Sequence, residues 1–247
     1  MGPLISIIIP ARNDAAACRH TLDCLQDVTG IADVEIIVAA SGDIGLTDEA
    51  VAGRARLLWP GFSSRAALMN SAADTARGEI LFFLHADSLP SADALAQIRV
   101  LLQRPEVVGG AFEHRFLEPL WSLRAISWIN RRRYRLTRNY YGDQGIFVRA
   151  EVFRSIGGYR DLALMEDLDL SQRLKRRGRT ALIGTPVVTS GRRFIDRGPW
   201  RTFGFIVWLL FLHTLRLDTQ RYARRWRGPS DAVPGSRWTP VQWRLKP

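Results

Sequence analysis

Three short apolar runs, typical of buried strands, constrain the fold of this chain more than any other feature. They are Leu4–Ile9, Val34–Ala39 and Glu79–Leu84. Segments with the apolar spacing of helices, Asp14–Gln26 and Ser63–Ala76, lie between them. Strands that alternate with helices of this length predict βαβ units and a parallel sheet with helices on both faces. We therefore expect an α/β fold.

Polar residues follow each run at the point where its strand is expected to end, and Pro10 is expected to stop the first strand. The clusters are Ala11-Arg12-Asn13-Asp14, Ser41-Gly42-Asp43 and His85-Ala86-Asp87. In open α/β sheets, ligands bind at the carboxyl ends of the strands, near a change in strand order. The three clusters therefore predict a binding site at one edge of the sheet.

His85 and Asp87 stand one residue apart at the end of the third run, and two interpretations compete. The pair could be a polar turn that leads into the next segment. Alternatively, alternate residues that leave a strand end can project to one side, where a carboxylate and an imidazole could bind a divalent cation that bridges phosphate oxygens. An imidazole ligand shifts the preference from Mg²⁺ toward transition metals such as Mn²⁺.

A second acidic group, Glu166, Asp167 and Asp169, lies in the first turn of a helix predicted over Asp167–Arg177. Acids are favoured at this place in any helix because they face the positive end of the macrodipole. One of these carboxylates could instead act as a general base on a hydroxyl nucleophile.

Three further polar segments also allow both a structural and a functional interpretation. Arg192-Arg193 could be a solvated turn or a clamp on a diphosphate leaving group. Asp143-Gln144 could bind polar groups of a substrate or only form a loop. The stretch Arg131–Arg135 could be a nucleic-acid patch, a membrane-facing loop or a solvated helix face, of which the last is the commonest.

The charge balance of the chain is basic. Its 247 residues include 35 Lys and Arg against 24 Asp and Glu, a net charge of +11, and Lys175 and Lys246 are its only lysines. Arginine's planar fork suits phosphate and diphosphate groups, and it also lies well at an anionic membrane surface. The charge alone does not choose among nucleic acid, lipid headgroups and nucleotide sugars.

The two cysteines and the N-terminal segment bear on the compartment. Cys18 and Cys24 are six positions apart on one predicted helix, which places them on different faces and argues against a disulfide. The first apolar run is short and β-branched and has no basic leader, so we expect no signal peptide. A reducing, cytoplasmic setting is the expectation.

The apolar segment Thr202–Leu217 carries arginines at its ends, Arg201 and Arg216. As a helix it would be about 24 Å long, short of the roughly 30 Å hydrocarbon core of a bilayer. It could be a buried helix or lie in a membrane interface. Together with the net charge and the Arg131–Arg135 stretch, it favours peripheral contact with an anionic membrane, such as the inner face of the plasma membrane. The basic, Pro-rich segment from Arg221 onward is expected to be loosely ordered.

Taken together, the motifs form an ordered pattern over roughly residues 4–195 that resembles family-2 glycosyltransferases. Stretches similar to Leu84-His85-Ala86-Asp87, Tyr141-Gly142-Asp143-Gln144-Gly145 and Arg192-Arg193 occur in small bacterial members sometimes labelled as arsenosugar-biosynthesis-like. The ordered motifs are Ile7-Ile8-Ile9-Pro10-x-x-Asn13-Asp14, Asn70, Gly78-Glu79 with Leu84-His85-Ala86-Asp87, Gly157-Gly158-Tyr159, and Glu166-Asp167-x-Asp169-Leu170-x-x-Arg173-Leu174.

The resemblance implies an A-type glycosyltransferase (GT-A) fold with a Rossmann-like, mostly parallel central sheet flanked by helices, followed by a C-terminal apolar helix. It implies a glycosyltransferase domain over residues 1–195, with a nucleotide-sugar-binding half (1–104) and an acceptor-binding half (105–195), and an apolar helix and basic tail over 196–247. The implied activity is inverting transfer of a sugar from a nucleotide-sugar to a hydroxyl acceptor, which could be lipid-linked, with Mn²⁺ or Mg²⁺ as cofactor.

The resemblance also implies roles for particular residues. Asp87 takes the place of the metal-binding Asp in the family's Asp-x-Asp motif, and His85 stands at the first position of that motif. Glu166-Asp167 matches the motif that carries the catalytic base, and Asp167 is the expected base. The expected nucleotide-sugar contacts are Pro10, Arg12, Asn13, Asp14, Asp43, Arg65, His85, Asp143, Gln144, Arg192 and Arg193.

One departure from the family pattern concerns the nucleobase. The second strand of these enzymes usually ends in an Asp that reads the base, and Ala40 stands there in this chain, although Asp43 could substitute from a shifted position. The donor is therefore expected to be a UDP- or GDP-sugar without a decision between them. A catalytically inactive nucleotide-sugar-binding or membrane-associated member is the alternative, and nucleic-acid binding has no support beyond the basic charge.

Overall fold

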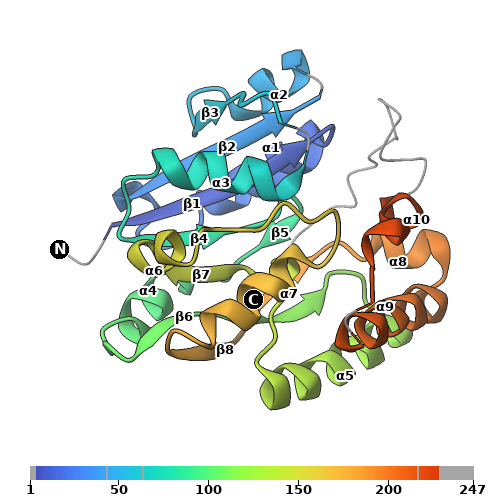
Figure 1. Cartoon of the computed structure of the whole chain (residues 1–247). Helices are drawn as coiled ribbons and strands as arrows, with labels where there is room; N and C mark the ends of the chain where they lie inside the picture. Colours follow the sequence, from blue (N-terminus) through green and yellow to red (C-terminus); the bar gives the residue numbers. More distant parts are fainter. Residues whose placement is uncertain (1–3, 43, 63, 216, 228–247) are drawn as a thin grey trace.

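The computed structural model describes residues 4–42, 44–62, 64–215 and 217–227, and these residues form an eight-stranded sheet with helices on both faces (Figure 1). The strand order is β3-β2-β1-β4-β7-β6-β8-β5. The expected α/β class, with a central sheet flanked by helices, is confirmed.

The first half of the chain is the predicted parallel βαβ arrangement. Strand β1 lies between β2 and β4 and runs parallel to both, and β3 extends the sheet beyond β2. The elements are β1 (Ile5–Arg12), α1 (Ala15–Leu25), β2 (Val34–Ser41), α2 (Ile44–Val51), β3 (Arg56–Leu58), α3 (Arg65–Thr75), β4 (Ile80–Phe83) and α4 (Ala94–Leu101).

The expectation that Pro10 stops the first strand is wrong. Strand β1 continues through Pro10 to Arg12, and Pro10 pairs with Ala39 of β2. The physical reason is that β4 pairs with β1 only as far as Ile8. Beyond Ile8 the strand has a neighbour on one side only, where the missing N–H of a proline is tolerated.

The rest of the sheet mixes strand directions. The sequence predicted its strands near residues 107–112 and 145–149, but not the strands Ser88–Leu89 and Arg179–Thr189. Strand β7 (Ile146–Arg149) runs antiparallel between β4 and β6 (Val107–Phe116), and β8 (Arg179–Thr189) runs parallel to β6. The short β5 (Ser88–Leu89) pairs with the end of β8. The segment after β4 therefore crosses from the middle of the sheet to its far edge, and the sheet curls.

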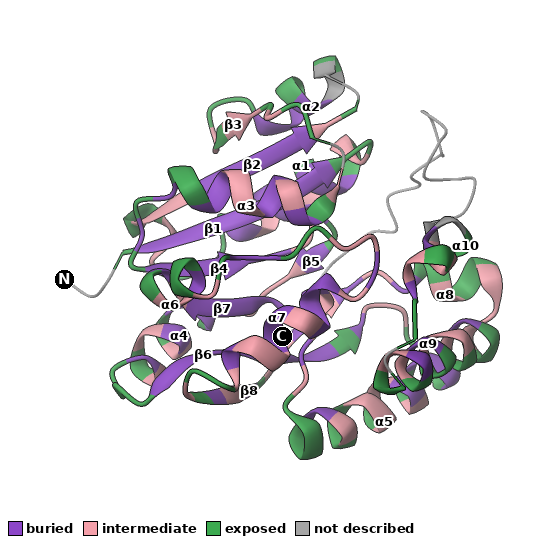
Figure 2. Ribbon diagram, in the orientation of Figure 1, coloured by how far each residue is buried: buried purple, intermediate pink, exposed green. Residues whose placement is uncertain are grey.

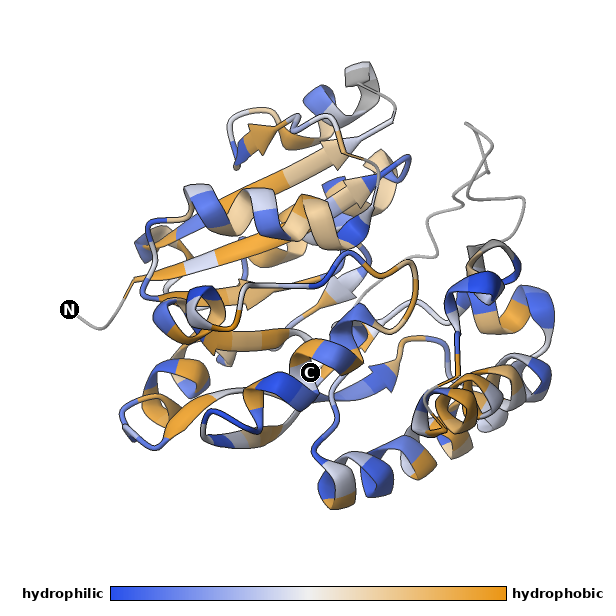
Figure 3. Ribbon diagram, in the orientation of Figure 1, coloured by the Kyte–Doolittle hydropathy of each residue, from blue (hydrophilic) through white to orange (hydrophobic). Residues whose placement is uncertain are grey.

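Two hydrophobic cores lie on opposite faces of the sheet, as the alternation of side chains along a strand requires. Ile7 of β1 faces one core with Leu22 of α1, and Ile8 faces the other with Leu68 of α3. Figure 2 shows that the central strands are mostly buried, and Figure 3 shows that most of their residues are hydrophobic. The short α6 (Ala150–Ser155) and α7 (Glu166–Leu174) pack on the second face.

Asn70, which belongs to the motif pattern, has a structural contact in α3. Its side-chain amide donates to the Tyr159 carbonyl at 2.8 Å, and its Oδ1 accepts from the Tyr159 N–H at 2.9 Å. Gly158 makes this close approach possible, because a Cβ at that position would lie 2.6 Å from Asn70 Oδ1. Asn70 therefore ties α3 to the loop before α7.

The basic stretch Arg131–Arg135 forms part of the helix α5 (Trp121–Thr137). Arg131 and Arg135 both pair with Glu113, a buried carboxylate on β6. A buried carboxylate is tolerated when it is paired and hydrogen-bonded, so this part of the stretch has a structural role.

The apolar C-terminal helix α9 (Pro199–Thr214) begins three residues earlier than expected, with Pro199 in its first turn. With α5, α8 (Arg192–Arg197) and α10 (Ala223–Arg227) it gathers at one end of the sheet (Figure 1). Trp121 of α5 and Trp200 of α9 lie 6.0 Å apart between ring centroids. Among the described residues, none of the helices has the length and apolarity that a membrane crossing needs.

Candidate active site

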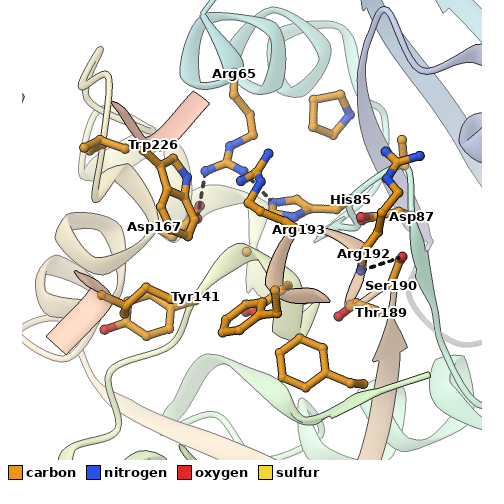
Figure 4. A pocket seen from close by; sticks show the side chains of 18 of the residues that line it. Arg65, His85, Asp87, Tyr141, Asp167, Thr189, Ser190, Arg192, Arg193 and Trp226 are labelled. Atoms are coloured by element: carbon orange, nitrogen blue, oxygen red, sulfur yellow. Dashed lines mark hydrogen bonds and ion pairs between the residues drawn. The ribbon is translucent and has the colours of Figure 1, made fainter. Parts of the chain in front are cut away.

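A cavity of about 390 Å³ opens at the edge of the sheet where β1, β4, β6 and β8 end. Strand β7 also contributes to this edge, because it runs antiparallel and its preceding loop therefore lies there. Ten predicted site residues line the cavity: Pro10, Arg12, Asp14, Arg65, His85, Asp87, Asp143, Asp167, Arg192 and Arg193. Figure 4 shows Arg65, His85, Asp87, Asp167, Arg192 and Arg193 among the side chains around it. The edge predicted from the strand ends is thus the edge that carries the cavity.

The other predicted residues lie beside the cavity or outside the description. Asn13 adopts a left-handed backbone conformation, and its side chain packs against Gly42. Gln144 is buried, donates to the Phe112 carbonyl at 2.8 Å and accepts from the Tyr141 N–H at 2.9 Å, so it holds the loop before β7. Glu166 is buried behind Asp167. Asp43 lies outside the described residues.

Arg65, at the start of α3, contacts three of the site's polar side chains. Ser64 caps this helix by accepting from the Ala67 N–H at 3.1 Å. The Arg65 guanidinium donates from Nε to Glu166 Oε1 at 2.6 Å, and its Nη2 lies 3.4 Å from Asp167 Oδ2. Its Nη1 lies 3.3 Å from Nε2 of His85. Arg65 therefore joins α3, the segment after β4 and α7 across the cavity.

Asp167 has an unusual proton affinity for a carboxylate. Burial and the adjacent Glu166 raise its pKa from 3.8 to about 7, although Arg65 works in the opposite direction. Its Oδ1 is buried and accepts no hydrogen bond. A carboxylate with a pKa near neutrality, at the wall of a cavity, is suited to accept a proton from a bound hydroxyl.

The third acid of this helix, Asp169, has a different environment. It accepts from Arg173 at 2.7 Å and from Arg160 at 3.1 Å, and it does not line the cavity. The structure thus separates Asp167, which faces the cavity, from Asp169, which makes ion pairs on the next turn of the helix.

Asp87 is exposed to the cavity, and its pKa is raised to about 6. The main cause of the raised pKa is that surrounding protein atoms displace water from the carboxylate. The negative charges of Asp14 and Asp143 raise the pKa further, and Arg193 lowers it. A divalent cation at this carboxylate would relieve the repulsion among the three acids. One carboxylate, water and phosphate oxygens are a common ligand set for Mg²⁺, so Asp87 fits such an ion.

His85 contacts Arg65 through its Nε2 nitrogen. Because a guanidinium can only donate, its contact with His85 Nε2 requires this nitrogen to be unprotonated. Burial and the charges of Arg65 and Arg193 hold the pKa of His85 well below its usual value. Among the residues that the structure describes, no group of three or more His, Cys, Asp and Glu side chains has the arrangement of a metal site.

Gly142 lines the cavity but was not among the predicted site residues. A Cβ at this position would lie 2.2 Å from His85 Nε2 and 2.8 Å from Asp167 Oδ2. The glycine therefore allows the imidazole and the carboxylate to approach the same stretch of backbone. Gly142 belongs to the motif Tyr141-Gly142-Asp143-Gln144-Gly145, and this motif was the sequence feature that could have indicated its place in the site.

Arg192 and Arg193 begin the short helix α8, so they do not form a turn. Arg192 Nη2 lies 3.9 Å from Asp14 Oδ2. The Arg193 guanidinium lies 5.0 Å from the ring centre of Trp226, a cation–π contact with α10. Two basic side chains therefore border the same cavity as Asp87.

Much of the cavity wall was not predicted, because it comes from segments whose residue pattern indicates a helix or a strand but gives no sign of a binding site. Ile206 and Leu209 are an example, since they read as ordinary apolar residues of α9. The unpredicted lining residues are Ala86, Phe116, Asn130, Tyr134, Tyr141, Gly142, Leu164, Met165, Thr189, Ser190, Phe194, Ile206, Leu209 and Trp226.

Comparisons with known proteins agree with this architecture. Residues 6–156 match the family model of Glycosyl transferase family 2. A mannosyltransferase, PcManGT from Pyrobaculum calidifontis in complex with GDP-Man and Mn²⁺, has a similar structure, with a TM-score of 0.65 and 20% identity over 94% of this chain and 69% of its own. S. aureus TarS 1–349 in complex with UDP-GlcNAc has a TM-score of 0.58 and 13% identity over 75% of this chain and 58% of its own. A search of curated proteins gave no match.

The chain belongs to glycosyl transferase family 2, because the family model matches more than half of its length. Its fold is the GT-A type, and the protein is a glycosyltransferase. The similarity to particular solved structures shows the fold alone. The arsenosugar-biosynthesis-like subfamily stays a prediction.

The raised pKa of Asp167 leads to a prediction on stability. An Asp whose pKa is about 7 in the fold and 3.8 when unfolded destabilises the fold as the pH rises from about 4 to 7, and the full effect remains above 7. We expect Asp167→Asn to increase the free energy of unfolding by up to about 4 kcal/mol at pH 8, and by little at pH 4.

Chemical denaturation at the two pH values measures this difference. Asp169→Asn is the matched control on the same helix, and it should lower stability because it removes a partner of Arg160 and Arg173. If Asp167→Asn destabilised the protein at pH 8 as Asp169→Asn does, the carboxylate of Asp167 would be a stabilising partner of Arg65 instead.

Proposed function

We propose that the protein is an inverting, divalent-metal-dependent glycosyltransferase that moves a sugar from a nucleotide-sugar to a hydroxyl acceptor. The observation that carries the proposal is a single cavity with a carboxylate of near-neutral pKa, Asp167, an exposed carboxylate, Asp87, and two arginines. We assign residues 1–104 to donor binding, 105–195 to acceptor binding and 196–247 to an apolar helix with a basic tail.

Asp167 is the proposed catalytic base. In inverting transfer, the base removes the proton of the acceptor hydroxyl while the hydroxyl oxygen attacks the anomeric carbon and the bond to the diphosphate breaks. A pKa of about 7 suits this step, because about half of the group is ionised at pH 7 and the ionised form is a stronger proton acceptor than an ordinary carboxylate. Glu166 and Arg65 are positioning residues that set the orientation and proton affinity of Asp167.

The departing diphosphate needs positive charge near its oxygens. Arg192 and Arg193 border the cavity and are the proposed side chains for this task. Asp87 is the proposed ligand of Mn²⁺ or Mg²⁺, which when bound would supply charge stabilisation to the diphosphate. His85 is proposed as a second ligand, for which its Nε2 would have to leave Arg65.

The proposed donor is a UDP- or GDP-sugar. PcManGT binds GDP-Man and TarS binds UDP-GlcNAc, so both nucleotides occur on this fold. Ala40 is buried in β2 and does not line the cavity, which leaves the usual base-reading position without a polar side chain. Pro10, Arg12 and Asp14, at the end of the neighbouring β1, are the proposed contacts on the nucleotide side.

We also propose peripheral contact with an anionic membrane through α5 and α9, which would suit a lipid-linked acceptor. The outward face of α5 alternates exposed Trp121 and Trp128 with Arg124 and Arg132, the pattern of an interfacial helix. Beside it, α9 exposes the apolar side chains of Trp200, Val207, Trp208 and Phe211, and Leu215 follows at its end.

The same helix α9 has its other side in the cavity wall, at Ile206 and Leu209. A lipid-linked acceptor held at the outer face would therefore need to pass only the width of one helix to reach the site. This arrangement supports the proposal that acceptor and membrane are approached from the same end of the molecule.

The first prediction for this function concerns donor and metal. In the presence of Mn²⁺, a matching UDP- or GDP-sugar should raise the melting temperature, and Asp87→Asn should remove the effect. The effect should also fade below pH 6, where Asp87 becomes protonated. A thermal-shift panel of both donor classes measures it, with Asp93→Asn, an exposed acid outside the cavity, as control. Absence of any shift across the panel would count against donor binding.

The second prediction concerns the base. Asp167→Asn should lower transfer, or donor hydrolysis, by at least about 10³-fold while the donor-induced thermal shift persists. In the wild type, kcat/KM should fall about tenfold for each pH unit well below 7, as Asp167 takes up a proton. A steady-state pH profile with the identified donor measures this. Turnover that survives in the variant would assign the base elsewhere, and no turnover in either protein would favour an inactive binding module.

The third prediction concerns the membrane. The protein should sediment with vesicles that contain phosphatidylglycerol and much less with pure phosphatidylcholine, and the double variant Trp128→Ser/Trp208→Ser should lose most of this binding. Trp59→Ser, an exposed tryptophan in the donor half, is the control. Equal sedimentation of the double variant and the control would contradict the proposed surface. If light scattering shows that the wild type is a dimer and the double variant a monomer, this face binds a second copy of the chain instead.

A further inference from the structure

A second cavity, of about 290 Å³, lies at the opposite edge of the sheet, where β6 and β8 begin. Its lining comes from the end of α4, the end of α5 and the start of β8. The residues are Leu101, Arg104, Val107, Tyr134, Arg135, Arg138, Tyr140, Arg179, Thr180, Ala181 and Leu182. None of the roles proposed above uses this cavity.

The cavity gathers positive charge. Four of its lining residues are arginines, and no acidic side chain is among the described residues that line it. Arg135 pairs with Glu113 at 2.8 Å and Arg179 lies 3.9 Å from Glu106, so these two charges are partly balanced from outside. Next to the cavity, Arg138 and burial lower the pKa of Lys175, which shows how closely cations are placed here.

Two buried hydroxyls make the cavity more than a basic surface patch. Tyr140 is fully buried and Thr180 is 5% exposed, and both line the cavity. The two hydroxyls are neighbours, and Thr180 partly offsets the rise in the pKa of Tyr140 that burial causes. Neither makes a hydrogen bond of normal geometry. Burying a hydroxyl without a well-formed hydrogen bond is unfavourable, so an oxygen-rich ligand at this place would supply hydrogen bonds that the protein alone does not provide.

We infer that this cavity binds a small phosphate-bearing molecule. Guanidinium groups match phosphate oxygens with two parallel hydrogen bonds, and hydroxyls complete the shell as donors. No Asp, Glu, His or Cys is among the described residues that line the cavity, so we assign it a binding role. The ligand is a free phosphate compound or the phosphate of a lipid headgroup.

Tyr134 lines both cavities, so an experiment must separate them. The probe is inorganic pyrophosphate, titrated by calorimetry in the presence of EDTA, so that no metal-dependent binding occurs in the active-site cavity. The double variant Arg104→Gln/Arg138→Gln should weaken binding at least about tenfold, the expected loss for charge-assisted hydrogen bonds. Arg192→Gln/Arg193→Gln, in the active-site cavity, should retain it, and Arg19→Gln on α1 is the control for charge alone.

The hydroxyls give a second test that does not change the charge. Thr180→Val keeps the shape of the side chain and removes an unsatisfied hydroxyl, so the free variant should melt at the same or a higher temperature than the wild type. Its stabilisation by pyrophosphate should nevertheless be smaller. An undiminished pyrophosphate effect in both Thr180→Val and Arg104→Gln/Arg138→Gln would overturn the inference.

Two further probes distinguish the source of the phosphate. Binding of inorganic phosphate or pyrophosphate that depends on Arg104 and Arg138 supports a free ligand. If the two arginines are needed only for binding to vesicles that contain phosphatidic acid, the ligand is the phosphate of a lipid headgroup. If the arginines mattered only for an oligonucleotide, the cavity would belong to a nucleic-acid surface and the inference would fail. None of these results depends on glycosyl transfer.

Discussion

The candidate site depends on one buried interaction, the pairing of Arg65 with Glu166 and Asp167. Arg65 begins α3 in the first half of the chain, and the two acids begin α7 in the second half. Burial raises the pKa of Asp167 to about 7, the adjacent charge of Glu166 adds to the rise, and Arg65 opposes both. The interaction that joins the halves therefore also sets the proton affinity of the proposed base.

The topology of the sheet brings the remaining groups to the same place. The chain leaves β4 in the middle of the sheet and reaches β5 at the far edge, so His85 and Asp87 lie across the strand ends. Because β7 runs antiparallel between β4 and β6, its preceding loop brings Gly142 and Asp143 to that edge as well. The opposite ends of β6 and β8 border the arginine-rich second cavity.

Local patterns predicted the first half well. The apolar runs became β1, β2 and β4, and the polar clusters that follow them lie at one edge because parallel strands end together. The exceptions have tertiary causes. Pro10 stays inside β1 because the neighbouring β4 has already ended, and Asn70 and Gln144 form structural hydrogen bonds although they belong to motifs. Strand β8 was not predicted, because its partners β6 and β5 lie far from it in sequence.

The sequence by itself determined the α/β class, the family pattern and most of the polar residues that meet in the cavity, because these follow from periodicity and from the order of short motifs. Only the tertiary structure decided which of the acids are buried together. Asp167 differs from Asp169 by its burial beside Glu166 and by the cavity it faces, and a pKa is a property of these surroundings. The unsatisfied hydroxyls of Tyr140 and Thr180 likewise exist only in the fold, because hydrogen-bond partners are assigned by distant parts of the chain.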